Sequence, residues 1–378
     1  MEEGTEQGKL NSIQNHASQS SEVKLGSQCN LAKNERFLID DDYYPNANNP
    51  PFVTCKSYVV IDTKNQKVLH GKSSGEVREM ASLTKMMTAI TSIELAQELK
   101  LDLYKTYFKV SSRAASTIGT TANLVSNQMV TIYDLLYGLM LPSGNDAGMT
   151  LAENFGEHIL ASNPIKKPNM ENEMQKSSIK LFVKQMNKMC LKLHLKNTYY
   201  TNPHGLADKA NHSTAFELAC VANYAMKNSI FAQIVSTKSY KSENNYLPLK
   251  RLLKLPNRDA SNYETVDEVP FETVDKQEYV HFPQTWCNSN KLLGLPGFGG
   301  VKTGITTTAG SCLCVYFTNS KLNKNIITVV LGSKNIQYRW KDTRRITLFA
   351  DACLQEDNKR QNSPAKKKVI QTAPKRFE

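Results

Sequence analysis

The chain has 378 residues, of which 40% are hydrophobic and 22% are charged, and these fractions are ordinary for a globular protein. It is long enough to bury one large core or two modest ones. Its longest apolar runs, such as residues 326–331, are only as long as a strand, which excludes a membrane-spanning helix. Much of the formal charge of +12 lies in residues 356–378, where no interleaved aromatic pattern accompanies it, so no nucleic-acid partner is expected.

Both ends of the chain are predicted to be disordered tails. Residues 1–50 are polar without hydrophobic periodicity, and residues 356–378 are basic with few apolar side chains. Because residues 1–30 contain no apolar run of the kind found in secretory signals, we expect no signal peptide and no membrane anchor, with the cytoplasm as the default compartment. One folded domain is expected over residues 51–355.

Ordered elements are predicted from residue 57 onwards. A strand at residues 57–62 is followed by a turn and a returning strand at 67–70. Helical periodicity follows at residues 82–100, 133–141, 180–195 and 215–228. Three strand patterns and a last helix come next, at residues 300–303, 311–318, 325–331 and 339–354. Two charged stretches with few periodic apolar residues, 162–176 and about 239–284, are interpreted as polar insertions.

This order of elements decides the predicted fold class. Strands, a helical block, more strands and a final helix indicate an α/β (α+β) fold. We expect an antiparallel sheet flanked by helices, with an all-helical lobe inserted between the segments of the sheet. No internal repeat is visible in the sequence.

The eight cysteines are scattered along the chain and form no CxxC pair. Cys312 and Cys314 lie two residues apart in a strand pattern, so they share a face and cannot comfortably bond each other. Buried free thiols are therefore expected, and these are compatible with a reducing compartment. No metal site and no cofactor site are expected.

Three short motifs follow one another: Ser82-Leu-Thr-Lys85, Ser143-Gly-Asn145 and Lys302-Thr-Gly304. Each is weak alone, because Ser-x-x-Lys also occurs at Ser21, Ser177 and Ser363. Their order along the chain and the residues around them make the combination informative.

Ser82 and Lys85 are three residues apart, so on a helix they share a face. A neutral lysine amine could then take the serine proton, as acyl transfer requires, if burial and a nearby cation lower its pKa. The plain alternative is a helix cap followed by an exposed lysine.

The other two motifs have both a chemical and a structural interpretation. A hydroxyl at Ser143 could relay a proton and the amide of Asn145 could orient a substrate or the lysine, but the segment could also be a simple turn. Glycines around Lys302 would let an extended peptide pair along the strand edge while the lysine attracts a carboxylate. The alternative is a glycine-rich edge strand with an exposed lysine.

Together these motifs resemble the low-molecular-mass penicillin-binding proteins, most closely their D-alanyl-D-alanine carboxypeptidase family. The matching passages are ASLTKMMT at residues 81–88, LPSGNDA at 141–147, NPHGL at 202–206, HSTA at 212–215, GVKTGIT at 300–306 and AGSCL at 309–313. The resemblance covers about residues 55–354 and implies the β-lactamase-like fold of penicillin-binding transpeptidases. It also implies a peptide substrate with a C-terminal carboxylate, and β-lactams as acylating inhibitors.

The resemblance implies a role for each matched residue. Ser82 would form the acyl-enzyme, Lys85 would be its general base, and Ser143 and Lys302 would relay protons and supply positive charge. Asn145 and Gly304 would line the substrate site, and the N–H groups of Ser82 and Ile305 would form the oxyanion hole. The substrate carboxylate would be bound by Thr303, Thr306 and Arg339. His204 is expected to be structural.

Two alternatives stay open from the sequence. The first is a β-lactamase or esterase on the same fold, although the Glu-x-x-Leu-Asn signature of the deacylating loop in class A β-lactamases is absent. The second is a non-catalytic binding protein that kept the scaffold. The intact motif residues argue against the second, because a binding protein has no physical need for all of them.

Overall fold

The computed structural model describes residues 43–162, 171–256, 258–272 and 277–362. Its main sheet has five strands in the order β12-β13-β14-β1-β2, and every neighbouring pair is antiparallel. The strands are β12 (Phe298–Thr306), β13 (Gly310–Asn319), β14 (Lys324–Ser333), β1 (Ser57–Asp62) and β2 (Val68–Lys72). The predicted antiparallel sheet is therefore confirmed, with β12 at one edge.

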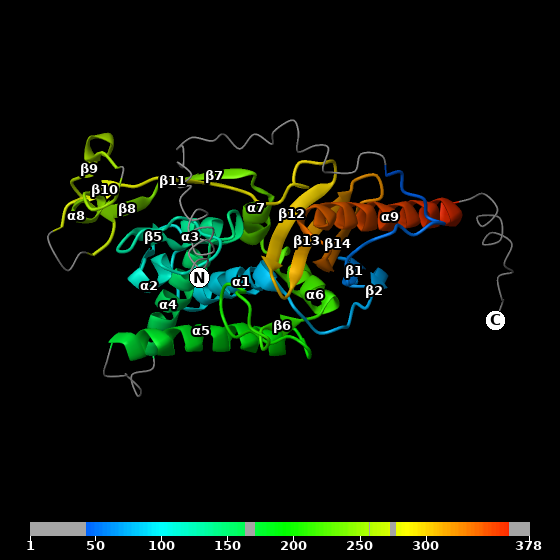
Figure 1. The fold of residues 1–378 in the computed structure, drawn as a ribbon, viewed down its shortest axis with the longest axis horizontal. Coiled ribbons are helices and arrows are strands. Elements are labelled where there is room, and N and C mark those ends of the chain that lie inside the picture. The colour runs from blue at the N-terminus through cyan, green and yellow to red at the C-terminus, as the bar shows by residue number, and fades with distance from the viewer. Residues whose placement is uncertain (1–42, 163–170, 257, 273–276, 363–378) are drawn as a thin grey trace, which may run out of the picture.

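Alternate residues of the strands serve two different cores. Val59 and Ile61 of β1 join the large core that includes the helical lobe, whereas Tyr58 and Val60 join a smaller core with Trp340. The period of two in a strand explains this division, because successive side chains point to opposite faces. The sheet thus lies between two helical layers, with α6 (Ala215–Ala225) against β1 and β14, and α9 (Ile336–Asn362) against β13 and β14 (Figure 1).

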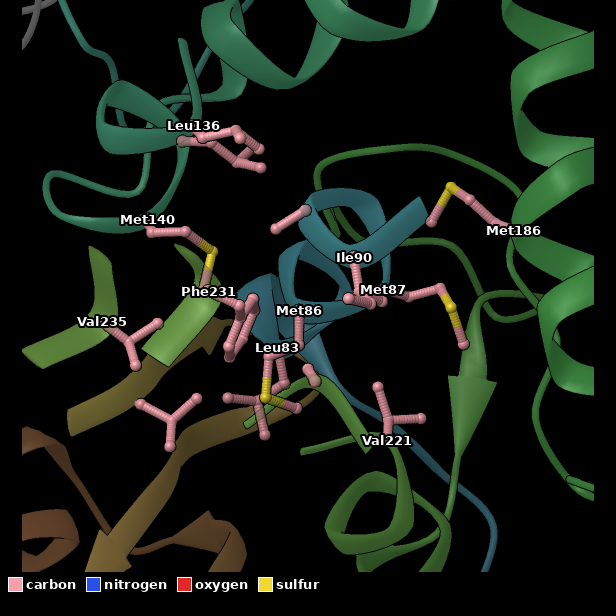
Figure 2. Packing of buried hydrophobic residues seen from close by; sticks show 14 of the residues in the cluster. Leu83, Met86, Met87, Ile90, Leu136, Met140, Met186, Val221, Phe231 and Val235 are labelled. Carbon is pink, nitrogen blue, oxygen red and sulfur yellow. The ribbon is translucent and has the colours of Figure 1, made fainter. Parts of the chain in front are cut away.

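The helical lobe is built around α1 (Thr84–Glu98), which Figure 2 shows at the centre of its core. Met86, Met87 and Ile90 of α1 pack among apolar side chains from neighbouring elements, which include Leu136, Met140, Met186, Val221 and Phe231. Burying a side chain of this size contributes about 1.5–3 kcal/mol each. The remaining helices of the lobe are α2 (Ser112–Ala115), α3 (Ile132–Met140), α4 (Asn145–Ala161), α5 (Glu171–Lys192) and α7 (Ser229–Ser236).

The lobe is not all-helical as predicted. Strands β4 (Tyr107–Lys109) and β5 (Met129–Thr131) pair with strands of the supposed insertion at 239–284, to give a second sheet in the order β4-β5-β8-β10-β9. The strands added by that segment are β8 (Asn245–Pro248), β9 (Thr265–Val266) and β10 (Tyr279–His281). With α8 (Leu249–Leu252), this sheet lies at the opposite end of the molecule from α9 (Figure 1). Its strands are too short to carry a clear period, so the sequence pattern did not reveal it.

Short elements complete the described chain. Strand β7 (Ser239–Ser242) pairs with β11 (Gln284–Cys287), and β3 (Arg78–Glu79) pairs with β6 (His212–Ser213). Two 3-10 helices, η2 (Ala81–Leu83) and η4 (Ala260–Asn262), stand at turns. No helix in the described ranges is long and apolar enough to cross a membrane.

Three predicted boundaries need correction. Helix α9 continues to Asn362, so the expected basic tail is helical over 356–362, and residues 363–378 lie outside the described residues. Residues 43–50 of the expected N-terminal tail are described and lie against α9, where Arg345 stacks 5.7 Å from the Tyr43 ring. The supposed insertion at 162–176 ends in helix α5 from Glu171, and 163–170 lie outside the described residues.

The described cysteines follow the expectation of free thiols with one exception, although Cys220 and Cys353 are only half-buried. Among the described cysteines, the free thiols are Cys55, Cys190, Cys220, Cys312, Cys314 and Cys353. Burial raises the pKa of Cys55 to about 12, so this thiol is unreactive near neutral pH. Cys287 is disulfide-bonded, so the expectation of free thiols is wrong at this residue.

Candidate active site

Ser82 lies in the tight turn η2 immediately before α1, and its neighbours Ala81 and Leu83 are buried while Ser82 itself is partly exposed. Ala81 has a φ of 50°, and its carbonyl accepts a hydrogen bond from Thr84 Oγ1 at 2.9 Å. A Cβ at Gly205, which has a φ of +84°, would lie 2.0 Å from the Ala81 carbonyl oxygen. Only glycine therefore fits there, and the loop that contains Gly205 packs closely against the serine turn.

Lys85 lies one turn further along α1 and is completely buried. Its Nζ contacts three oxygens: Asn145 Oδ1 at 2.7 Å, the His204 carbonyl at 2.6 Å and Ser82 Oγ at 3.0 Å. The predicted pairing of Ser82 with Lys85 is thus present in the structure. The alternative of an exposed lysine after a helix cap is wrong.

Burial lowers the pKa of Lys85 well below its ordinary value, and the positive charge of Lys302 lowers it further, while Asp146 acts in the opposite direction. A neutral amine has two hydrogens and one lone pair. Because the Asn145 and His204 oxygens can only accept, they take both hydrogens. The lone pair is then left for the hydroxyl of Ser82, which is the arrangement a general base needs.

Asn145 begins α4, and its two amide atoms face different partners. Its Nδ2 donates to the Ile118 carbonyl at 2.7 Å, which fixes Oδ1 toward Lys85. A Cβ at Gly119 would lie 2.6 Å from that Nδ2, so glycine is needed there for space, and its φ of +97° also favours glycine. The adjacent Asp146 is buried and accepts from the backbone N–H of Ala122 at 2.9 Å, which ties the 118–124 segment to α4.

Ser143 lies in the turn before α4 with a φ of 68°. Its side chain is only 4% exposed, and its Oγ has no hydrogen-bond partner among the described residues. A buried hydroxyl without a partner costs about 1–3 kcal/mol, so its position needs another explanation, such as a substrate atom. No hydrogen bond joins Ser143 Oγ to Lys302 Nζ, the expected relay pair, within the described residues.

Strand β12 forms the opposite wall of the site. Lys302 is 1% exposed and its Nζ donates to the Thr303 carbonyl at 3.1 Å. Burial, followed by the charge of Arg339, lowers the pKa of Lys302 to about 7. A Cβ at Gly304 would lie 3.1 Å from the Ser82 backbone nitrogen, so β12 runs directly against the serine turn.

The three residues expected to bind a carboxylate, Thr303, Thr306 and Arg339, each form a different contact within the protein. The Thr303 hydroxyl is 2.8 Å from Ser289 Oγ, and Thr306 Oγ1 accepts from the Ala309 N–H at 3.0 Å, which closes the β12–β13 turn. Arg339 is buried and donates from Nη1 to the Gly304 carbonyl at 3.1 Å. The structure therefore brings Arg339 to β12. Ile305 is 47% exposed at the strand edge.

Sequence reasoning missed part of this site. The His204 carbonyl contacts Lys85, whereas only the imidazole was considered, and no sequence signal reveals which backbone oxygen meets a lysine. Burial and then the charge of Lys85 lower the pKa of His204 to about 3, so its ring is neutral near pH 7. Asp146 and Ser289 were also missed, although Asp146 adjoins a recognised motif. The described residues contain no His/Cys/Asp/Glu group that could hold a metal ion.

A family model described as D-alanyl-D-alanine carboxypeptidase matches residues 45–158 and 173–269. The chain is 32% identical over 287 residues to a D-alanyl-D-alanine carboxypeptidase of Streptomyces sp. (strain K15), covering 75% of this chain and 82% of that protein. It is 29% identical over 297 residues to D-alanyl-D-alanine carboxypeptidase DacF of Bacillus subtilis (strain 168), covering 78% of this chain and 61% of that relative.

Solved structures show the same similarity. The crystal structure of the Streptomyces K15 DD-transpeptidase superposes with a TM-score of 0.64 and 27% identity, covering 80% of this chain and 99% of that one. Penicillin binding protein 5 from Haemophilus influenzae gives a TM-score of 0.58 and 25% identity, covering 80% of this chain and 72% of that one. The expected β-lactamase-like fold is confirmed by these structures.

Proposed function

This chain belongs to the D-alanyl-D-alanine carboxypeptidase family, and from that premise we propose that it is a serine-type D-Ala-D-Ala carboxypeptidase working through an acyl-enzyme on Ser82. One observation carries the proposal. The buried Lys85 amine has two acceptors for its hydrogens, and its remaining lone pair faces the Ser82 hydroxyl. Peptide binding alone does not require a buried lysine whose lone pair faces a serine hydroxyl.

Acylation begins with nucleophilic attack by Ser82. Ser82 Oγ attacks the carbonyl carbon of the penultimate residue while its proton passes to Lys85 Nζ. The N–H groups of Ser82 and Ile305 stabilise the negative oxygen that forms, supported by the close approach of β12 at Gly304. The C–N bond breaks as Ser143 passes a proton to the leaving amine and takes one from protonated Lys85, so that Lys85 is neutral again when D-alanine departs. Water later hydrolyses the ester and restores Ser82.

Substrate binding uses the opposite wall. The C-terminal carboxylate lies near Lys302 and Thr303, where a buried cation and a hydroxyl stand together on β12. Arg339 braces the same strand through the Gly304 carbonyl. A β-lactam carries both a reactive amide and a carboxylate, so it occupies the same positions and acylates Ser82. The natural donor is then a peptidoglycan peptide that ends in D-Ala-D-Ala.

The β-lactamase alternative has less support. Rapid deacylation in that class needs a carboxylate that activates a water. The carboxylate closest in sequence to the motifs, Asp146, already accepts hydrogen bonds from the N–H groups of Ala122 and Leu124 and from Thr121 Oγ1. It is therefore engaged in holding the 118–124 segment. We expect the penicilloyl-enzyme to be long-lived.

Intact-mass analysis after incubation with benzylpenicillin tests the proposal. We expect one adduct on the wild-type protein and none on Ser82→Ala. The matched control is Ser177→Ala, because Ser177 and Lys180 form another Ser-x-x-Lys pair on α5 and should keep the adduct. D-Alanine release should occur from an acylated peptide ending in D-Ala-D-Ala and not from its L-Ala-L-Ala counterpart. An unmodified wild-type protein after prolonged exposure, or an adduct that survives Ser82→Ala, would contradict the assignment.

A further inference from the structure

A cavity of about 620 Å³ opens beyond the end of β12, outside the site described above. Its walls come from the β12–β13 turn at Thr307 and Thr308, from the segment before β1 at Phe52 and Lys56, and from the start of α9 at Lys334 and Tyr338. The volume is in the range of small-ligand pockets. None of the proposed catalytic groups lies in its wall.

The charged side chains that line the cavity are both positive. Lys56 and Lys334 are both exposed, and the described residues that line the cavity include no aspartate or glutamate. Neither lysine forms an ion pair with any described residue. Lys334 Nζ lies 5.7 Å from the centre of the Tyr338 ring, which also lines the cavity.

One carboxylate lies beneath the cavity floor. Asp342 is 1% exposed and accepts hydrogen bonds from Thr54 Oγ1 at 2.7 Å and from Ser333 Oγ at 2.9 Å. Those two hydroxyls, together with the Thr54 N–H at 3.0 Å, compensate its charge inside the protein. The open face of the cavity therefore presents the two lysines together with the exposed aromatic ring of Phe52.

The direction of a bound peptide connects this cavity with catalysis. If the terminal carboxylate lies at Lys302 and Thr303 and the scissile carbonyl at Ile305, the upstream part of the peptide continues toward Thr306 and Thr308. An extended chain advances about 3.3 Å per residue. A side chain two to four residues before the scissile bond therefore reaches the β12–β13 turn and the cavity behind it.

We propose that this cavity is a subsite for an acidic group carried by the acyl donor two to four residues upstream of the scissile bond. The inference rests on the proposed carboxypeptidase function, because that function sets the direction of the peptide along β12. Lys56 and Lys334 bind the carboxylate, and Phe52 and Tyr338 cover the aliphatic part of the same side chain.

The test compares two acetylated pentapeptides ending in D-Ala-D-Ala, with either glutamate or glutamine at both the third and fourth positions from the C-terminus. For the wild-type protein we expect kcat/KM to be about 5- to 20-fold higher for the acidic peptide, since each exposed ion pair contributes a factor of a few. Adding 0.5 M salt should reduce this preference by screening it.

Two sets of variants test whether the preference for the acidic peptide comes from the cavity lysines. Lys56→Gln combined with Lys334→Gln should bring the ratio to within about twofold of one, because the loss of both charges removes the ion pairs. Lys321→Gln is the matched control, since this exposed lysine lies in the β13–β14 turn at the other end of the same strands and should leave the ratio unchanged.

Benzylpenicillin tests the proposed function separately from the proposed subsite, because its short neutral side chain does not reach the cavity. All variants should be acylated at the wild-type rate. Failure of the wild-type protein to acylate would overturn the proposed function. Normal acylation with no preference between the peptides, or a preference that survives the double lysine variant, would overturn the subsite alone.

Discussion

Gly304→Ala tests whether the close approach of β12 to the serine turn is needed for acylation. The added Cβ would lie 3.1 Å from Ser82 N, 3.2 Å from Ala81 Cβ and 3.3 Å from Leu83 N, which are all tighter than ordinary van der Waals contact. The serine turn cannot yield easily, because the backbone of Gly205 already lies close to the Ala81 carbonyl of the same turn. Strand β12 must therefore move outward by a few tenths of an ångström.

This displacement gives the expected magnitude. Loss of one oxyanion donor typically costs about 10²–10³ in rate, and a misplacement of about 1 Å costs about 10². A shift of a fraction of that size at the Ile305 N–H should slow acylation by about 10- to 100-fold, or about 1.4–2.7 kcal/mol in the barrier. Gly304 does not have a positive φ, so alanine is allowed by the backbone and the melting temperature should change little.

The assay is the rate of benzylpenicillin acylation, followed by intact mass in samples quenched at fixed times. Gly299→Ala is the matched control, because it adds the same methyl group to the same strand and its nearest contact would be an ordinary 3.5 Å to Tyr316 Cδ1. Its rate should stay within about twofold of wild type. Wild-type kinetics in Gly304→Ala, or an equal loss in both variants, would refute the reasoning from close approach.

Four further outcomes are expected. The acylation rate should rise with pH along one ionisation and reach a plateau, because only neutral Lys85 accepts a proton and its pKa is lowered; a rise that continues above about pH 10 would contradict this. Lys85→Arg should lose at least about 10²- to 10⁴-fold, since guanidinium stays protonated. Ser289→Ala should raise the KM for the peptide about 3- to 10-fold by releasing the Thr303 hydroxyl, and Ser289→Thr should restore it; an unchanged KM would remove this positioning role. Lys302 has a pKa of about 7 when folded and 10.5 otherwise, so the unfolded chain binds more protons between these values and stability should rise with pH there. Urea unfolding at pH 7 and pH 9 should show a smaller rise in stability in Lys302→Met, and an equal rise in both proteins would argue against a lowered pKa of Lys302.

The sequence by itself determined the elements whose signal is local. Strands β1, β13 and β14 and helices α1, α3 and α6 were predicted from their apolar runs and the spacing of apolar residues, because this signal lies within each segment. The pairing of Ser82 with Lys85 was also predictable, since their spacing fixes their relation within one helical turn. Helix α4 was missed because most of its side chains are buried, polar ones included, so its apolar residues form no single stripe.

Only the tertiary structure decided what Lys85 does. Its other two acceptors, Asn145 and the carbonyl of His204, come from segments distant in sequence, and their meeting depends on how α1, α4 and the His204 loop pack together. The second sheet also depends on tertiary packing, because β4 and β5 precede helices α3 to α7 in the sequence whereas β8, β9 and β10 follow them. A periodic pattern reports which face of an element is buried, but it carries no information on which distant element covers that face. The lowered pKa of Lys85 is therefore a property of the packed core, where burial and the charge of Lys302 act on it together.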